Sequence, residues 1–302
     1  MANLFFITDL HITTACNSRV DDPLETVIGK LQWVVDYCNH HCATLVMGGD
    51  IFDTPTVTFE AYNALVYVLR NVHRGVYVVW GNHDMLYRNT GNNRKCTLYT
   101  LIESGVVKEL HPDMDVVLDS ELLLTSHLPL RTRQIPQVLV YHGFLEQRDG
   151  SFTVTMSDLV GCESGGTSLV LLGHDHTKYD DVVLPNGVTV VRCGSFFRNR
   201  RDESCRRQVY GVMVECSNGF IHHTLVEVPA RTPEEVFASK SSQQVADAQM
   251  GEVSYDALIS SLRSSTGSQD LTFSEALGAV AEQDVVSYCE TLVSNKIVKK
   301  VK

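Results

Sequence analysis

Residues 4–11 read Leu-Phe-Phe-Ile-Thr-Asp-Leu-His, an apolar run that ends in a carboxylate and an imidazole. A continuous apolar stretch of this kind is typical of a β-strand that is buried on both faces. Polar side chains follow an apolar run in the same way at four later places along the chain. The residues at the ends of the predicted strands are therefore the first candidates for a functional site.

Predicted helices and strands alternate through the first part of the chain. Asp22 and Pro23 mark the start of a helix, because an acidic N-cap followed by proline is a common helix beginning. Strands are predicted at 45–47 and 76–80, with an amphipathic helix at 59–69 between them. Such alternation implies parallel strands that are joined by right-handed crossovers.

The pattern changes to hairpins in the second part of the chain. Buried strands at 138–141 and 168–172 are followed by strand pairs that flank the turn residues 185–187 and 217–219. The sequence therefore predicts an α/β fold in the form of an α+β sandwich. Two mixed β-sheets face each other, helices flank them, and a short helical appendage closes the chain.

Three regions are predicted from composition. Residues 1–228 form the main domain, residues 229–252 form a polar linker rich in Ser, Gln and Ala, and residues 253–302 form short helices with apolar stripes. Such short helices are marginal alone in water, so each stripe needs a surface to cover it. Either a partner protein or the chain's own main domain could provide that surface.

Carboxylate, carboxamide and imidazole groups follow five consecutive predicted strands. Carboxyl ends of strands line the ligand crevice in α/β sheets, and these groups bind hard to borderline divalent ions. Each short motif alone is usually a surface turn or an ordinary histidine, but five in chain order favour a metal site. The motifs are Asp9 and His11, Asp50, Asn82-His83-Asp84, His142, and His174 with His176.

In this order, D-x-H, G-D, G-N-H-D, H-G and G-H-D-H resemble the calcineurin-like metallophosphoesterase superfamily over residues 1 to about 228. The resemblance implies two divalent metal ions, and ligands without a thiolate suit Mn²⁺, with Fe or Zn as alternatives. It implies that one ion is held by Asp9, His11, Asp50 and His176, and the other by Asp50, Asn82, His142 and His174.

The same resemblance gives His83 the position of the family's catalytic histidine, either as general acid or as a stabiliser of the transition state. Asp53 matches the carboxylate that orients this histidine in relatives. An ordinary helix cap before Thr54 and Pro55 is the alternative interpretation of Asp53.

Within the superfamily the chain resembles the SbcD and Mre-eleven type DNA repair exonucleases, including phage recombination nuclease subunits. Residues 48–53, Arg19 with 21–22, and 194–195 carry this resemblance, whereas residues 12–14 and the short C-terminal region depart from it. It implies a DNA exonuclease or endonuclease subunit of an SbcCD-like repair or recombination complex. A phosphodiesterase acting on cyclic nucleotides, or a non-enzymatic scaffold, are the alternatives.

The formal net charge of -11 argues against a protein that coats nucleic acid, so DNA would need a local basic patch. Arg198, Arg200 and Arg201 follow the last metal motif and are predicted to contact DNA phosphates. Phe196 and Phe197 beside them either stack on a base or belong to the core, and the core is the preferred interpretation.

Nine cysteines without a C-x-x-C pair, and no signal peptide or transmembrane run, predict a cytoplasmic protein. The resemblance implies two partners, DNA and an SbcC-like coiled-coil ATPase that residues 253–302 would bind. The sequence leaves a homodimer open, and it predicts no association with a membrane.

Overall fold

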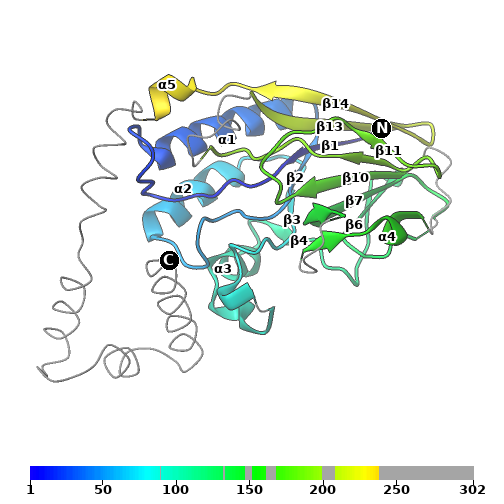
Figure 1. Cartoon of the computed structure of the whole chain (residues 1–302), viewed down its shortest axis with the longest axis horizontal. Coiled ribbons are helices and arrows are strands. Elements are labelled where there is room, and N and C mark those ends of the chain that lie inside the picture. The colour runs from blue at the N-terminus through cyan, green and yellow to red at the C-terminus, as the bar shows by residue number, and fades with distance from the viewer. Residues whose placement is uncertain (89, 132, 147–151, 161–167, 199–207, 238–302) are drawn as a thin grey trace, which may run out of the picture. The chain divides into compact units, whose positions relative to one another are not determined.

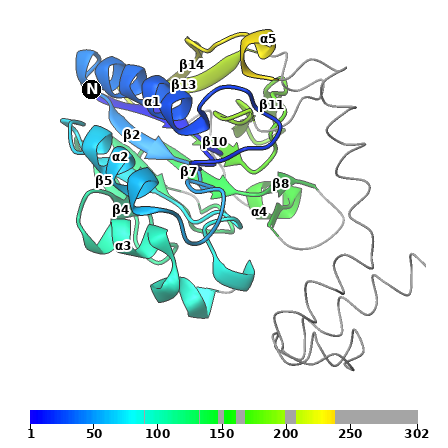
Figure 2. The same ribbon diagram turned by 90° about the vertical axis from the view of Figure 1, so that its left-hand side faces the viewer.

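The computed structural model describes residues 1–237 apart from 89, 132, 147–151, 161–167 and 199–207. Within these residues, two six-stranded sheets lie between helices, which confirms the predicted sandwich of mixed sheets. In Figure 1 the strands of both sheets run across the view. Figure 2 shows α1, α2 and α3 on one side of the sheets and α4 on the other.

The first sheet has the strand order β14-β13-β1-β2-β3-β4. Strands β1 to β4 run parallel, whereas β13 is antiparallel to both β1 and β14. Its strands are β1 (Ala2–Ile7), β2 (Thr44–Met47), β3 (Val76–Val78), β4 (Lys108–Glu109), β13 (Val209–Ser217) and β14 (Phe220–Val228).

The second sheet has the order β11-β12-β10-β7-β6-β5, with β12, β10, β7 and β6 parallel. Its strands are β5 (Val116–Leu118), β6 (Leu122–Thr125), β7 (Gln137–His142), β10 (Ser168–Gly173), β11 (Val182–Val183) and β12 (Thr189–Val191). A short parallel pair, β8 (Phe144–Leu145) and β9 (Thr153–Val154), lies beside it.

The helices cover the outer faces of the two sheets. Helices α1 (Pro23–His40), α2 (Phe59–Leu69) and α3 (Thr97–Glu103) pack on the first sheet, and α4 (Met156–Val160) packs on the second. Two 3-10 turns, η1 (Leu86–Arg88) and η2 (Thr90–Lys95), follow β3. No helix of the described residues is long and apolar enough to cross a membrane.

Alternation along β1 connects the layers of the core. Leu4 and Phe6 pack between the two sheets, whereas Phe5 and Ile7 pack against the helices on the outer face. All four side chains are fully buried, and burying a side chain of this size stabilises the fold by about 1.5–3 kcal/mol. The continuous apolar run at the start of the chain therefore holds three layers together.

Residues 229–237, the first part of the predicted linker, pack against the main domain. A short helix, α5 (Pro233–Val236), leads into Phe237, and the last residue of the helix and Phe237 are 0% and 2% exposed. Val20 N donates to the Val236 carbonyl at 3.0 Å. The sequence analysis did not predict this packing, because the region as a whole is polar and only these two side chains are buried. The rest of the predicted linker, and residues 253–302, lie outside the described residues.

A buried ion pair fastens this segment. Arg19 donates through Nε and Nη2 to the two carboxylate oxygens of Asp21, at 2.8 and 2.7 Å. The guanidinium also lies 4.7 Å from the ring centre of Phe197 and 5.7 Å from that of Phe237. Burial raises the pKa of Asp21, but the hydrogen bonds from Arg19 and Thr26 outweigh it and lower the pKa below its usual value.

We expect Asp21→Asn to lower the free energy of unfolding by about 3 kcal/mol, because it leaves the Arg19 charge buried without its partner. The adjacent Asp22→Asn is the matched control, since asparagine caps a helix about as well as aspartate. Because the folded pKa of Asp21 is lowered, its contribution is complete above about pH 4 and is lost as the pH falls through that lowered pKa. Urea denaturation at pH 7 and pH 3 measures both effects, and equal losses in the two variants would contradict the assignment.

Candidate metal centre

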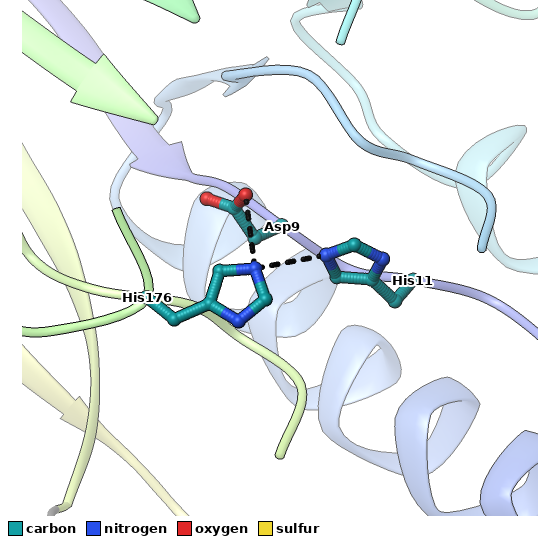
Figure 3. Close-up of side chains that lie close together, drawn as sticks. All are labelled: Asp9, His11 and His176. Carbon is teal, nitrogen blue, oxygen red and sulfur yellow. Dashed lines mark hydrogen bonds and ion pairs between the residues drawn. The ribbon is translucent and has the colours of Figure 1, made fainter. Parts of the chain in front are cut away.

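The ends of β1 and β10 form a first cluster of polar side chains (Figure 3). His11 Nε2 and His176 Nε2 face each other at 3.1 Å, and His176 Nε2 lies 3.6 Å from Asp9 Oδ1. Asp9 and His11 are 0% and 1% exposed. One ligand atom from each of the three residues lies within 4.8 Å of the others, so a single cation could contact all three.

A second cluster joins the ends of β2, β3, β7 and β10. Ligand atoms of Asp50, His142 and His174 also lie within 4.8 Å of one another. His142 Nε2 is 3.3 Å from Asp50 Oδ2 and 3.3 Å from the side-chain oxygen of Asn82. The second sheet thus contributes imidazoles, and the first sheet contributes a carboxylate and a carboxamide.

Asp50 lies between the two clusters. Its Oδ2 atom is 3.3 Å from His142 Nε2 in the second cluster and 3.8 Å from His11 Nε2 in the first. The side chain is 2% exposed, so water screens these charges poorly. The structure therefore brings all the predicted ligands into two adjacent clusters with one carboxylate between them.

The backbone at the site is held in an uncommon conformation. Asp9, His11, Asp50 and His174 have positive φ angles of 56°, 43°, 48° and 84°. Each such angle in a residue other than glycine costs about 1–3 kcal/mol, so the surroundings must hold it. Backbone amides do so: His174 N donates to Asp9 Oδ2 at 3.0 Å, and His83 N donates to Asp50 Oδ1 at 2.8 Å.

Further contacts orient the metal-facing groups. His142 Nδ1 donates to the Gly48 carbonyl at 2.8 Å, which leaves Nε2 facing Asp50 and Asn82. Thr8 Oγ1 donates to Asp9 Oδ2 at 2.8 Å. Outer partners of this kind fix the tautomer and orientation of ligands in metal sites.

Close approach of the two sheets requires glycine at this end. A Cβ atom on Gly173 would overlap the side-chain oxygen of Thr8 and the carbonyl of Gly48. Gly48 follows β2 of the first sheet and Gly173 ends β10 of the second, so any added side chain would push the ends of the sheets apart. The glycine in the G-H-D-H motif therefore acts through packing, and it keeps His174 within reach of Asp50.

The pKa values reflect the crowding of charges. Burial lowers the pKa of His142, but the adjacent Asp50 carboxylate outweighs burial and raises the pKa to about 9. Burial raises the pKa of Asp50, yet His142 and His11 shift it well below its usual range. Burial and the neighbouring His142 lower the pKa of His174 to about 4. The Asp50 carboxylate thus stays ionised and favours a cation beside it.

His83 lies beside the first cluster without belonging to either set of predicted ligands. Its Nδ1 atom is 2.7 Å from the backbone carbonyl of Asp53, and its ring meets the His11 ring edge-on at a centroid distance of 4.7 Å. The Asp53 carboxylate instead lies 3.2 Å from His11 Nδ1. Asp53 therefore makes its direct contact with His83 through its main-chain carbonyl. Its carboxylate is paired with His11, and one carboxylate oxygen also lies within 4.8 Å of a His83 ring nitrogen, so the orienting role that the resemblance implied stays a prediction. The Ile12–Phe52 bridge explains this, because it places Asp53 alongside the loop of His11.

Asp84 carries a role that the sequence motif did not reveal. Its carboxylate is fully buried and accepts hydrogen bonds from the amides of Ile51, Phe52 and Gly81 at 3.2, 3.0 and 3.0 Å. It ties the loop after β2 to the loop after β3. Burial and the nearby Asp50 charge raise its pKa to about 7. The only indication of this role in the sequence was the position of Asp84 at the end of the G-N-H-D motif.

The predicted DNA contact fails at Arg198. Its side chain is buried, with 8% of the residue exposed, and it donates to the Arg231 carbonyl, so it binds the segment that follows β14. Phe196 and Phe197 are 0% and 1% exposed, which agrees with the preferred interpretation that they belong to the core. Arg200 and Arg201 lie outside the described residues, and their role stays a prediction.

The donor set fits divalent metal ions. Two carboxylates, one carboxamide and four imidazoles converge, and none of these ligands is a thiolate. Mixed oxygen and nitrogen donors suit Mn²⁺, Fe²⁺ or Zn²⁺. The fold and this donor set are those of a metallophosphoesterase. A family model described as calcineurin-like phosphoesterase matches residues 2–178, which include every predicted ligand.

The matched residues make up more than half of the chain. The chain therefore belongs to the calcineurin-like phosphoesterases. Members typically bind two divalent metal ions and hydrolyse phosphoric esters.

Solved structures that are similar to the chain include the following two. One is a 5'-nucleotidase precursor from Thermus thermophilus, with 13% identity and a TM-score of 0.47 over 82% of this chain and 58% of that chain. The other is a conserved uncharacterized protein, a predicted phosphoesterase, from Streptococcus pneumoniae. It has 14% identity and a TM-score of 0.34 over 75% of this chain and 99% of that chain. The chain thus spans little more than half of the nucleotidase precursor, and no curated protein matches it.

We expect Gly173→Ala to weaken metal binding at least tenfold, because the new methyl group must displace the Thr8 and Gly48 atoms beside the clusters. Gly29→Ala is the matched control: it has open space around it in α1, and alanine there should raise stability by about 0.5–1 kcal/mol. Calorimetric titration with Mn²⁺ and a thermal melt of each variant test this. Unchanged affinity in Gly173→Ala would show that the sheets tolerate separation.

Proposed function

We propose that this chain hydrolyses phosphodiester bonds with two divalent metal ions, Mn²⁺ first among them, and that its substrate is DNA. The observation that carries the proposal is the position of Asp50, with one carboxylate oxygen close to both clusters. A carboxylate in this place could help to hold both cations of a two-metal site, which would supply the chemistry for in-line displacement at phosphorus.

In this proposal, one group of side chains holds the metal ions and His83 acts on the substrate. Bound divalent ions neutralise phosphate charge and supply a nucleophile at neutral pH. Asp9, His11, Asp50 and His176 would hold one, and Asp50, Asn82, His142 and His174 the other.

His83 then has a separate task. Because the Asp53 carbonyl engages Nδ1, the Nε2 atom of His83 is free to face substrate. It can give a proton to the leaving oxygen or stabilise charge on the phosphate.

DNA is the proposed substrate because the Gly-Gly-Asp-Ile-Phe-Asp run at 48–53 and the lead into α1 resemble SbcD and Mre-eleven type nucleases. Arg19 and Asp21, part of that resemblance, form the buried pair that fastens residues 229–237. A phosphodiesterase acting on cyclic nucleotides would need the same metal ligands, so substrates must separate the two functions.

We propose further that residues 253–302 bind an SbcC-like coiled-coil ATPase in a DNA repair or recombination complex. Tyr255, Leu258 and Leu262 fall on one stripe at helical spacing, and Val286 belongs to a second stripe. A partner surface is proposed because the resembling nucleases use this part of the chain to hold their ATPase.

Replacing Asp50 and His83 should have different consequences. Asp50→Ala should abolish diesterase activity and reduce bound metal at both positions. His83→Ala should retain metal while turnover falls by about 10²–10⁴-fold, the usual contribution of a positioned acid. Asp175→Ala is the control. Asp175 lies between two predicted ligands, but its carboxylate accepts a hydrogen bond from the Thr177 amide, so this variant should keep both its bound metal and its turnover. Loss of metal in His83→Ala equal to that in Asp50→Ala would refute this division of roles.

The substrate is tested by assaying the same proteins with Mn²⁺ on single-stranded DNA, duplex DNA and cyclic nucleotides. The proposal requires Asp50-dependent cleavage of DNA. Hydrolysis of cyclic nucleotides alone would establish the small-molecule alternative, and no hydrolysis of any diester would favour a non-enzymatic scaffold.

The partner is tested in the full chain. Leu258→Asp combined with Val286→Asp should prevent co-purification with a coiled-coil ATPase encoded beside this gene, because charge opposes burial of both stripes. Ser260→Asp combined with Ser287→Asp adds the same charge off the stripes and should leave binding intact. Diesterase activity should persist in both variants. ATPase binding that survives the first pair would exclude these stripes as the interface.

A further inference from the structure

A cavity of about 420 Å³ opens beside the metal centre, next to the carboxyl ends of β3, β4, β6 and β7. Its volume lies within the range of small-molecule sites, about 300–1,000 Å³. Trp80, Tyr141 and Phe152 give it aromatic surface, and Met85 adds an adaptable apolar side chain. His142, which belongs to the second cluster, forms part of the wall.

A second, smaller hollow lies on the His83 side of this cavity. Met85 also lines a smaller hollow of about 250 Å³ that includes Asn82, His83 and Asp53. The turn from Asn82 to Met85 therefore separates the two hollows, and a phosphate at the clusters lies next to both. A substituent on that phosphate can extend into the larger cavity while the phosphate stays at the metal centre.

Hydrogen-bond acceptors lie along the aromatic walls. The side-chain oxygen of Asn93 is buried and has no hydrogen-bond partner among the described residues. The Glu109 carboxylate accepts one hydrogen bond from Trp80 Nε1 at 2.9 Å, which leaves it further capacity. A buried acceptor without a partner is costly, so turning the Asn93 side chain toward a ligand donor in the cavity would be favourable.

We propose that this cavity binds the nucleobase of a nucleotide whose phosphate lies at the metal centre. A nucleobase combines a flat ring for the aromatic side chains with N–H donors at its edge for Asn93 and Glu109. The inference rests on the proposed function for the position of the phosphate. It narrows the substrate to nucleotide diesters, as opposed to alkyl or sugar phosphates.

The test compares two ligands on the Mn²⁺-loaded full chain by calorimetry: deoxyadenosine 5′-monophosphate and 2-deoxyribose 5-phosphate, which lacks the base. The nucleotide should bind at least about tenfold more tightly, the lower part of the range for one stacked base. Trp80→Ala should reduce this ratio to within about twofold of one. Trp80→Phe keeps an aromatic face and should restore most of it.

Trp33→Ala is the matched control, because Trp33 is the other tryptophan of the chain and packs on Tyr37 in α1, away from the cavity. It should leave the ratio unchanged. Asn93→Ala gives a second variant in case Trp80→Ala does not fold, and it should lower the ratio about threefold or more. A ratio near one in the wild-type protein, or a ratio unaffected by Trp80→Ala and Asn93→Ala, would overturn the nucleobase site.

Diesterase activity on bis(p-nitrophenyl) phosphate is measured on the same preparations. Active protein with a ratio near one overturns the cavity assignment alone and leaves the proposed function standing. A ratio of tenfold without hydrolysis of any diester supports the nucleobase site and refutes the proposed function. The two failures are therefore distinguishable.

Discussion

Two carboxylates, Asp9 and Asp50, are buried where the ends of the two sheets meet, and the rest of the site is arranged around their charge. An unpaired ion in a low-dielectric interior is strongly unfavourable, so each oxygen needs a donor or a cation. Backbone amides and imidazoles from both sheets approach these oxygens. The same geometry that makes the carboxylates costly to bury makes the position favourable for divalent metal ions.

This arrangement demands precision from the backbone. Left-handed residues at both carboxylates turn the chain sharply after the strand, and hydrogen bonds to the carboxylates themselves hold those turns. Asp84 acts in a similar way behind the ligands, because it joins the two loops that carry Asp50 and Asn82. Strain and charge are thus balanced by one connected network, and a local change is expected to affect several ligands together.

The negative net charge of the chain is compatible with a phosphate substrate. A net charge of -11 repels a polyanion at long range, yet two divalent ions held by the predicted ligands would place concentrated positive charge where the proposed phosphate binds. The proposed nucleobase site beside His142 would add attraction of another kind, since stacking does not depend on net charge. Substrate recognition in this family member can therefore rely on short-range contacts at the centre, and the burial of Arg198 shows that a nearby arginine need not face substrate.

The sequence alone predicted the alternating strands and helices of the first part of the chain, the later hairpins and the two facing sheets, but not β4, β5, β6 or α3. The ligand set was predicted from the motifs after the strands together with the family resemblance. These are local properties, because burial pattern, capping and the residue after a strand are all read within a few positions. Only the tertiary structure decided which atoms meet. Asp53 contacts His83 by its carbonyl and His11 by its carboxylate, Arg198 faces the interior, and Phe237 closes on Arg19 from outside the expected domain boundary. Each of these depends on the approach of segments far apart in the chain, and a side chain's identity does not state which neighbour it will reach.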